Sequence, residues 1–351
     1  MLGRRLSHIA SSFKSCVPLL RTAPARFYAQ PFRGRCAAFT ASHGNDLGGG
    51  GNSEGNRVVA EAVLEKIEPL SPTVRLLTLR LQQPEAALFT FLPGMWVDFY
   101  IPAIDHVGGY TIISLPEELP LLNLAVKITS HPPAAWIGKA ATPGDKVTVR
   151  AGGNFHLGDV IQTQAGSGVN LESQQQPMSL DVNHLMLVAG GIGLTPLYAM
   201  VRHWEHAHRQ RSKGESAEGS IVVPRNLTLL YSCRNLDEMV FLEELQKIRA
   251  SVSPSGNMRL HLHITGQACG QVSDTDVVHG RIALEHLVDA LDGVISSRDE
   301  SVTDDSLDAR LKNRQGVLCC ICGPQAMTDG TAFLLKALGL HQRQVRFEKW
   351  W

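Results

Sequence analysis

The sequence predicts a two-domain fold, an antiparallel β-barrel followed by a parallel-sheet α/β domain. Three observations support this prediction. The length of 351 residues suits two domains better than one. Short alternating strands fill residues 57–158, whereas strands and helices alternate over residues 183–351. The composition, 44% hydrophobic and 19% charged, is that of an ordinary globular protein.

The first 45 residues predict a targeting segment. They contain six arginines, one lysine and several serines but no acidic residue, and the first acid is Asp46. The remaining chain holds 26 basic against 33 acidic side chains, a net charge of −7. An arginine-rich, acid-free start is typical of a mitochondrial transit peptide, so we expect a mitochondrial protein, in the matrix. The alternative is a disordered basic tail without a targeting role.

Residues 57–158 predict the barrel. The alternation of apolar and polar residues, with proline and glycine turns between the runs, is typical of short antiparallel strands. One helix is expected at residues 131–141, where Pro132 or Pro133 suits its first turn. The expected strands are residues 57–70, 74–81, 95–102 after a turn at Pro93-Gly94, 110–114, 122–129 and 145–151.

Residues 183–351 predict the α/β domain, separated from the barrel by a polar linker at 159–182. Alternating strands and helices imply a parallel sheet covered on both faces. Two polar surface insertions are expected at 210–225 and 292–315. Strands are expected at 183–189, 226–233, 258–265 and 317–323, and helices at 196–209, 237–250, 281–291 and 326–339.

Overall charge and cysteine usage exclude several functions. The 33 basic and 33 acidic side chains give zero net charge, which argues against a nucleic-acid partner. The sequence contains no run of eighteen apolar residues, so no transmembrane helix is predicted. The Cys319-x-x-Cys322 spacing invites a zinc or redox interpretation, but its apolar surroundings predict a buried strand. Cys320 and Cys322 then face one side of the sheet and Cys319 the other, so core packing is favoured.

The strongest local signal is the glycine-rich segment 189–196, between an apolar strand and an amphipathic helix. Glycines allow a sharp turn and a close approach of phosphate to the backbone. Thr195 is expected to cap the helix, and Pro196 to fit its first position, so that free amides face an anion. The alternative is a tight turn without a ligand. The predicted contacts to a dinucleotide are Gly190, Gly191, Gly193, Thr195 and Pro196.

Four segments in chain order resemble the ferredoxin–NADP reductase superfamily. They are LVAGGIGLTP, LLYSCRNLDEMVFLEEL, ICGPQAM and VRFEKW. Within the superfamily, VGGYTIIS, HPPAAW and FEKWW look most like the oxidoreductase NAD-binding domain-containing proteins. The resemblance implies an FAD-binding barrel at 57–158 and an NAD(P)-binding domain at 183–351.

The flavin half departs from the family pattern. By resemblance, Tyr110 would stack on or bond the flavin, Thr111 would bond its ring, and the pattern ends at Ser114. The family's phosphate-binding arginine is Gly108 here, and its phosphate-binding serine is Ala135, which leaves Lys127 to supply positive charge. The chain is therefore expected to bind FAD weakly, to bind FMN instead of FAD, or to bind no flavin. The alternative for Tyr110 is an ordinary strand aromatic.

The nicotinamide half supplies the remaining site residues. By resemblance, Cys322 would face the nicotinamide at a strand terminus, followed by Gly323 and Pro324, and Glu348 and Trp350 form the family's terminal pair. The alternatives are a packed core thiol and a tryptophan that caps the edge of the core. The residues expected at the reacting rings are Cys322, Thr111 and Glu348.

These features together predict an FAD-dependent NAD(P)H oxidoreductase that passes a hydride from nicotinamide to flavin, and electrons onward to a separate acceptor. The alternative is a non-catalytic nucleotide-binding or assembly protein with a degenerate flavin site. NADH is predicted over NADPH, because strand 258–265 ends without a cation for a 2′-phosphate. Arg234 could reach the ribose, or it is a solvated loop cation.

Overall fold

The computed structural model describes the parts of the chain that belong to one compact unit, namely residues 58–158, 182–213, 223–252, 257–266, 277–292 and 314–349. Its two sheets correspond to the two predicted sheets, so the predicted fold class is confirmed. The expectations for residues 1–57, for residues 159–181 and for Trp350 lie outside the described residues. None of the described helices is long and apolar enough to cross a membrane.

The first sheet is antiparallel, with the spatial order β4-β3-β6-β1-β2-β5. Its edges meet because Ile112 bridges Leu124 and the amide of Ile113 donates to the carbonyl of Asn123 over 2.9 Å. Helix α3 (Pro132–Lys139) follows the last edge strand and starts with two prolines, as predicted. The strands are β1 (Val59–Pro69), β2 (Val74–Leu81), β3 (Trp96–Ile101), β4 (His106–Thr111), β5 (Leu121–Lys127) and β6 (Lys146–Gly152).

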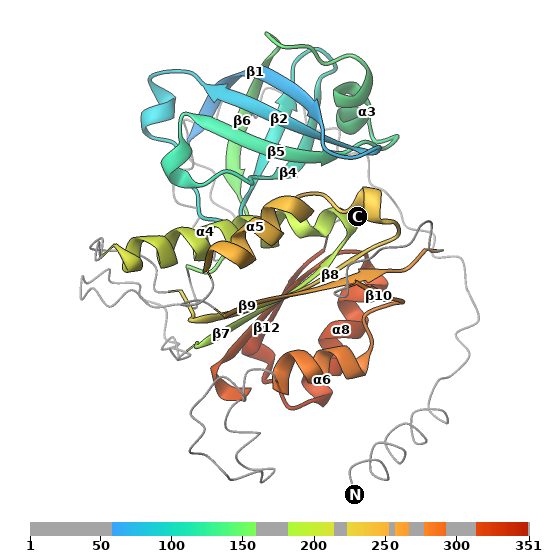
Figure 1. The fold of residues 1–351 in the computed structure, drawn as a ribbon. Coiled ribbons are helices and arrows are strands. Elements are labelled where there is room, and N and C mark those ends of the chain that lie inside the picture. Colours follow the sequence, from blue (N-terminus) through green and yellow to red (C-terminus); the bar gives the residue numbers. More distant parts are fainter. Residues whose placement is uncertain are drawn as a thin grey trace, which may run out of the picture. The chain divides into compact units, whose positions relative to one another are not determined.

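The second sheet is parallel, with the order β10-β9-β8-β7-β11-β12. Every residue of β7, β8 and β11 is buried, which explains their nearly continuous apolar sequences. Helices α4 and α5 cover one face of the sheet, and α6 and α8 cover the other (Figure 1). The strands are β7 (His184–Gly190), β8 (Asn226–Cys233), β9 (Asn257–Ile264), β10 (Val277–His279), β11 (Val317–Cys322) and β12 (Val345–Glu348). The helices are α4 (Leu194–Ser212), α5 (Leu242–Val252), α6 (Leu284–Asp292) and α8 (Gln325–Ala337).

The helix predicted at 237–250 is wrong at its start. A short 3-10 turn, η4 (Leu236–Glu238), is followed by an extended break before α5. The amide of Val240 donates to the Tyr231 hydroxyl over 3.1 Å, and Phe241 takes a φ of 58°. This break turns three apolar side chains into the core, and burial outweighs helix propensity there.

The cysteine alternation is confirmed. Cys320 and Cys322 pack with the core under α4 and α5, whereas Cys319 packs with the core under α6 and α8. The described cysteines are all free and buried.

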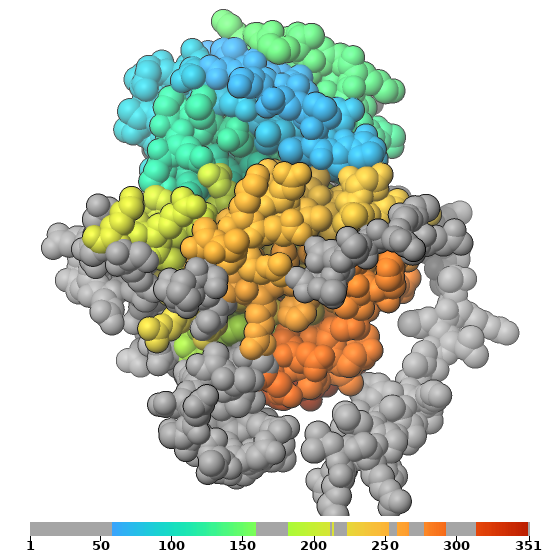
Figure 2. Space-filling view, in the orientation of Figure 1, coloured from blue at the N-terminus to red at the C-terminus, as the bar shows by residue number. Residues whose placement is uncertain are grey.

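The barrel and the parallel sheet share buried contacts. Val74 and Phe155 of the barrel belong to the same apolar cluster as Leu197 of α4. The hydroxyl of Thr73 donates to the carboxylate of Glu238 over 2.6 Å. The barrel surface adjoins that of the segment around α5 on the face drawn in Figure 2. These contacts hold the two walls of the cavity described next.

Candidate functional site

A cavity of about 450 Å³ lies where the barrel meets the parallel sheet. The end of β4, β5 and the start of α3 form one wall. The loop after β7 and the end of β11 form the other. Pockets of roughly 300–1,000 Å³ commonly hold cofactors and small ligands. The cavity brings together ten predicted site residues, Tyr110, Thr111, Lys127, Gly190, Gly191, Gly193, Thr195, Cys322, Gly323 and Pro324.

The position of the cavity in the sheet favours a ligand. Strand β7 pairs with β8 on one side and with β11 on the other, so the chain order reverses between β7 and β11. In open parallel sheets, ligands bind outside the carboxyl ends of the strands at such a reversal. The cavity wall is built from the residues that follow these two strand ends, at Gly190 and Cys322.

Two glycines of the loop are required for different physical reasons. Gly191 takes a φ of 55°, and no atom lies within 4 Å of the place where its Cβ would stand. A Cβ on Gly193 would instead collide with the carbonyl of Cys322 and lie 2.6 Å from the nitrogen of Gly323. The loop therefore packs closely on β11 at one glycine and stays open at another. The amide of Leu194 already donates to the carbonyls of Gly191 and Ile192, so the loop backbone ahead of the helix is the part that suits an anion.

The structure corrects the predicted cap. The chain passes through a 3-10 turn, η3 (Gly191–Gly193), directly into α4 at Leu194, so Thr195 and Pro196 lie inside the first helical turn. The Thr195 hydroxyl donates to the carbonyl of Ile192 over 3.0 Å instead of accepting from an amide. Pro196 still costs no hydrogen bond, because first-turn amides have no helical partner.

Cys322 is fully buried at the end of β11 and lines the cavity. Burial raises the pKa of its thiol well above the usual value, and the carboxylate of Glu348 raises this pKa further. Cys322 lies opposite Glu348 in the register of β11 and β12. The thiol therefore stays protonated at neutral pH and contributes shape to the cavity, since only a thiolate is strongly nucleophilic.

Tyr110 and Thr111 form the barrel wall at the end of β4. The ring of Tyr110 packs edge-to-face on Phe99 with 5.7 Å between centroids. Its hydroxyl is buried and has no hydrogen-bond partner among the described residues, and burial raises its pKa. A Cβ on Gly108 would lie 2.8 Å from that hydroxyl. Tyr110 therefore lines the cavity with its hydroxyl buried, and its side chain occupies the space that a longer residue at 108 would need.

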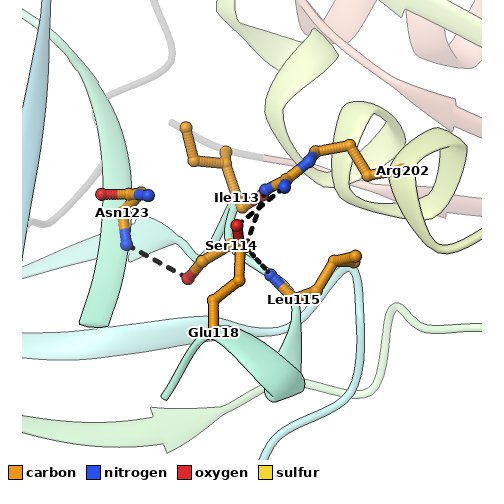
Figure 3. Close-up of polar contacts among 6 residues, drawn as sticks. All are labelled: Ile113, Ser114, Leu115, Glu118, Asn123 and Arg202. Carbon is orange, nitrogen blue, oxygen red and sulfur yellow. Dashed lines mark hydrogen bonds and ion pairs between the residues drawn. The ribbon is translucent and has the colours of Figure 1, made fainter. Parts of the chain in front are cut away.

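A charged clamp joins the segment after Thr111 to helix α4 (Figure 3). The guanidinium of Arg202 donates to both carboxylate oxygens of Glu118 and to the carbonyl of Ile113, each over 2.9 Å. Burial raises the pKa of Glu118, but the hydrogen bonds from Arg202 and the Leu115 amide outweigh burial and hold that pKa below its usual range. Sequence reasoning missed this pair, because nothing in either local pattern indicates a partner 84 residues away.

Some predicted site residues do not line the cavity. The Ser114 hydroxyl accepts the amide of Asn123 over 3.1 Å (Figure 3). Pro196 and Arg234 lie outside the lining, and so does Glu348, although it neighbours Cys322 on the adjacent strand. Their predicted contacts with a cofactor stay predictions.

An antiparallel barrel joined to a parallel sheet, with a glycine loop at the sheet's reversal point, defines the ferredoxin reductase class of fold. A ferredoxin NADP+ reductase from Neisseria gonorrhoeae with bound FAD and NADP has the same fold, with a TM-score of 0.56 at 16% identity over 83% of this chain and 98% of that one. The cytochrome b5 reductase domain of Ulva prolifera nitrate reductase scores 0.55 at 18% identity, over 83% and 97% of the two chains.

The sequence places the chain within a narrower family. Residues 187–332 match the oxidoreductase NAD-binding domain. Oxidoreductase NAD-binding domain-containing protein 1 of Danio rerio is 31% identical over 290 residues, which cover 80% of this chain and 88% of that protein. The chain belongs to the oxidoreductase NAD-binding domain-containing protein 1 family. At the family level, the fold is that of NAD(P)H-linked flavin oxidoreductases.

The cavity fits the parts of the expected cofactors unequally. The open glycine loop and the first turn of α4 fit a dinucleotide diphosphate. The Tyr110 ring and the Thr111 side chain offer a surface for a flavin ring. The start of α3, where the cavity's barrel wall ends, does not fit a second diphosphate, because prolines occupy its first two positions.

Proposed function

We propose that the chain is an NAD(P)H-dependent flavin oxidoreductase. One observation carries the proposal, the cavity shared by the Tyr110–Thr111 strand end and the glycine loop at the reversal point of the parallel sheet. A site between two such walls suits two planar rings that face each other, because ring alignment is the main contribution a protein makes to hydride transfer. A bound flavin supplies the ability to accept a hydride from the nicotinamide.

The residues of the chain bind the nucleotide and align the two rings. The loop glycines and the first turn of α4 hold the nucleotide diphosphate. Cys322 and Gly323 form the floor beside the loop, and their close packing on Gly193 fixes the distance between the loop and β11. The clamp between Arg202 and Glu118 keeps the segment after Thr111 in position, so that both walls keep their spacing.

The test is anaerobic mixing of the full chain with NADH and added flavin, followed by the visible absorbance of oxidised flavin. We expect protein-dependent loss of this absorbance at least about tenfold faster than without protein, because alignment lowers the barrier. NADH binding without any protein-dependent reduction would contradict the proposal and favour a non-catalytic nucleotide-binding protein. The electron acceptor beyond the flavin is a separate molecule in this scheme.

Coenzyme choice belongs to the same proposal, with NADH as the preferred donor. The strand β9 ends before Thr265, whose hydroxyl donates to the carbonyl of Cys233 over 3.2 Å and brings no charge. Arg234 is exposed and does not line the cavity. An NADP site needs a cation for its 2′-phosphate, and Thr265 and Gly266 at the end of β9 supply none.

The proposed location is the mitochondrial matrix, on the composition of residues 1–45. Fusion of residues 1–45 to a fluorescent reporter is expected to send the reporter to mitochondria. A reporter that stays in the cytosol, or mitochondrial import of the chain without these residues, would contradict the targeting role.

A further inference from the structure

The barrel end of the cavity has little capacity for phosphate. Helix α3 starts beside the cavity, at Ala134 and His131, but its first two positions are Pro132 and Pro133, which have no N–H. The amide of Ala135 donates to the carbonyl of His131 over 2.8 Å. The amide of Ala134 is thus the remaining first-turn donor in α3, all of which the structure describes.

The arginines of the barrel are engaged elsewhere. Residues 58–158, all of which the structure describes, contain three arginines. Arg75 donates to the carbonyls of Ser71 and Val74, over 3.3 and 3.2 Å. The other two form ion pairs within the barrel, Arg80 with Glu65 and Arg150 with Asp98. A bidentate arginine contact, the strongest common recognition of a phosphate, is therefore not offered by this domain.

The basic side chains that do line the cavity are Lys127 and His131, among lining residues that are all described. Both are exposed, so solvent screens the charge of Lys127. A diphosphate placed here would lose part of its hydration and gain one amide, one screened ammonium and one exposed imidazole in exchange. The other wall differs, because its glycine loop has open space at Gly191 and leads into a helix of 19 residues.

We propose that the cavity recognises flavin by its ring and not by its phosphates, so that flavin is a dissociable substrate of this chain rather than a resident FAD. This inference rests on the proposed oxidoreductase function and names its second substrate as a free flavin. In one turnover NADH gives up a hydride and leaves as NAD+. The flavin gains that hydride and one proton from water, and leaves as dihydroflavin.

Equilibrium titration of flavin fluorescence against the full chain tests the inference, with riboflavin, FMN and FAD under the same buffer and salt. We expect the three dissociation constants to agree within about fivefold, because the shared ring makes the contacts that count. A preference for FAD or for FMN beyond that range overturns the inference, since it would require a phosphate site on the barrel.

A double variant sharpens the result. Pro132→Ala with Pro133→Ala restores two amides at the start of α3, and we expect FAD to gain about threefold to tenfold over riboflavin. Pro143→Ala is the matched control, because Pro143 is exposed and follows the other end of α3. It should leave the ratio unchanged. An unchanged ratio in a folded double variant, or an equal rise in the control, would contradict the role assigned to the two prolines.

The outcomes separate this inference from the proposed function. FAD that binds tightly and is reduced by NADH overturns the inference and leaves the oxidoreductase function standing. Flavins that bind equally without NADH-dependent reduction overturn the function and leave the ring recognition standing. Failure of all three flavins to bind overturns both.

Discussion

Two helices start at the same cavity, and their first turns are built in opposite ways. Helix α4 follows an open glycine loop, whereas α3 starts with Pro132 and Pro133. Both prolines favour helix initiation, since the fixed φ of proline suits the first turn. The same residues remove the amides that an anion would bind. The two prolines thus favour the start of the helix but remove the amides that would bind a phosphate.

The difference extends to the way each wall is held. On the α4 side, the loop packs directly on the backbone of Cys322 through Gly193, without room for a side chain. On the barrel side, the segment after Thr111 is bonded to Asn123 within the barrel and also to the guanidinium of Arg202, which comes from the other domain. The glycine-loop wall is therefore fixed by its own packing, whereas the barrel wall also has a polar contact between domains.

The largest effect is expected at Gly193, where the glycine-loop wall packs most closely. Gly193→Ala places a Cβ against the backbone of Cys322 and Gly323, which must shift. We expect a loss of roughly 3 kcal/mol or more in the free energy of unfolding, or a loss of NADH affinity of about a hundredfold in the folded variant. Chemical denaturation and NADH titration measure the two effects.

Gly330→Ala is the matched control for this change. Gly330 lies in the interior of α8 with open space at its Cβ, so alanine should raise stability by about 0.5–1 kcal/mol and leave NADH binding unchanged. If Gly193→Ala had normal stability and normal NADH affinity, close packing would not be what fixes the glycine-loop wall. The two walls would then not differ in the way described.

The second effect tests the clamp. Arg202→Met removes three hydrogen bonds and leaves the Ile113 carbonyl and the Glu118 carboxylate without that partner. Because the two side chains are 24% and 37% exposed, solvent screening limits the cost, which we expect to be about 2 kcal/mol. Glu118→Gln should cost less, and the double variant no more than Arg202→Met alone. Additive costs in a double-mutant cycle by thermal unfolding would show that the two residues act independently.

The third effect is the response of the α/β domain to acid. Burial, together with the charge of Arg259, lowers the pKa of His184 to about 3. The unfolded chain, with a histidine pKa near 6.5, therefore binds more protons, and stability falls as the pH drops below about 6.5. At pH 5.5 the loss from His184 is about 1.4 kcal/mol. Denaturation at pH 7.5 and 5.5 measures it, and His184→Leu should remove this part of the pH dependence. An unchanged dependence in that variant would assign the acid effect to other groups.

The smallest effect concerns coenzyme choice. Arg234→Ala is expected to change the ratio of NADH to NADPH affinity by less than about threefold, because Arg234 does not line the cavity. Competition titrations of the two nucleotides measure the ratio. Tighter binding of NADPH that collapses in the variant would place the 2′-phosphate on Arg234.

Strand patterns predicted the fold well, because buried parallel strands and half-buried antiparallel strands leave different sequence periods. The runs at 184–190, 226–233 and 317–322 are mostly apolar, are buried throughout and form the centre of the parallel sheet. The helix start near 237 was mispredicted, because tertiary burial of Phe241 overrides a local helical pattern. Strand β10 has three residues and is too short to show a period.

The site was only partly predictable. Motif residues that follow strand ends, such as Gly191 and Cys322, meet in the cavity because parallel strands bring their carboxyl ends together. Arg202 and Glu118 could not be found, since their contact depends on how the domains pack. The Thr195 cap failed because the 3-10 turn advances the helix start. The loss of amides at Pro132 and Pro133 could have been found from the sequence alone, once the helix was predicted to start there.

The most direct test of the central claim is to desalt the purified full chain, record its visible absorbance, and then add NADH with riboflavin. We expect the desalted protein to lack the absorbance of bound flavin and nevertheless to speed the reduction of added riboflavin by NADH. A protein that keeps FAD in a one-to-one ratio through desalting, and does not reduce added riboflavin, would contradict it.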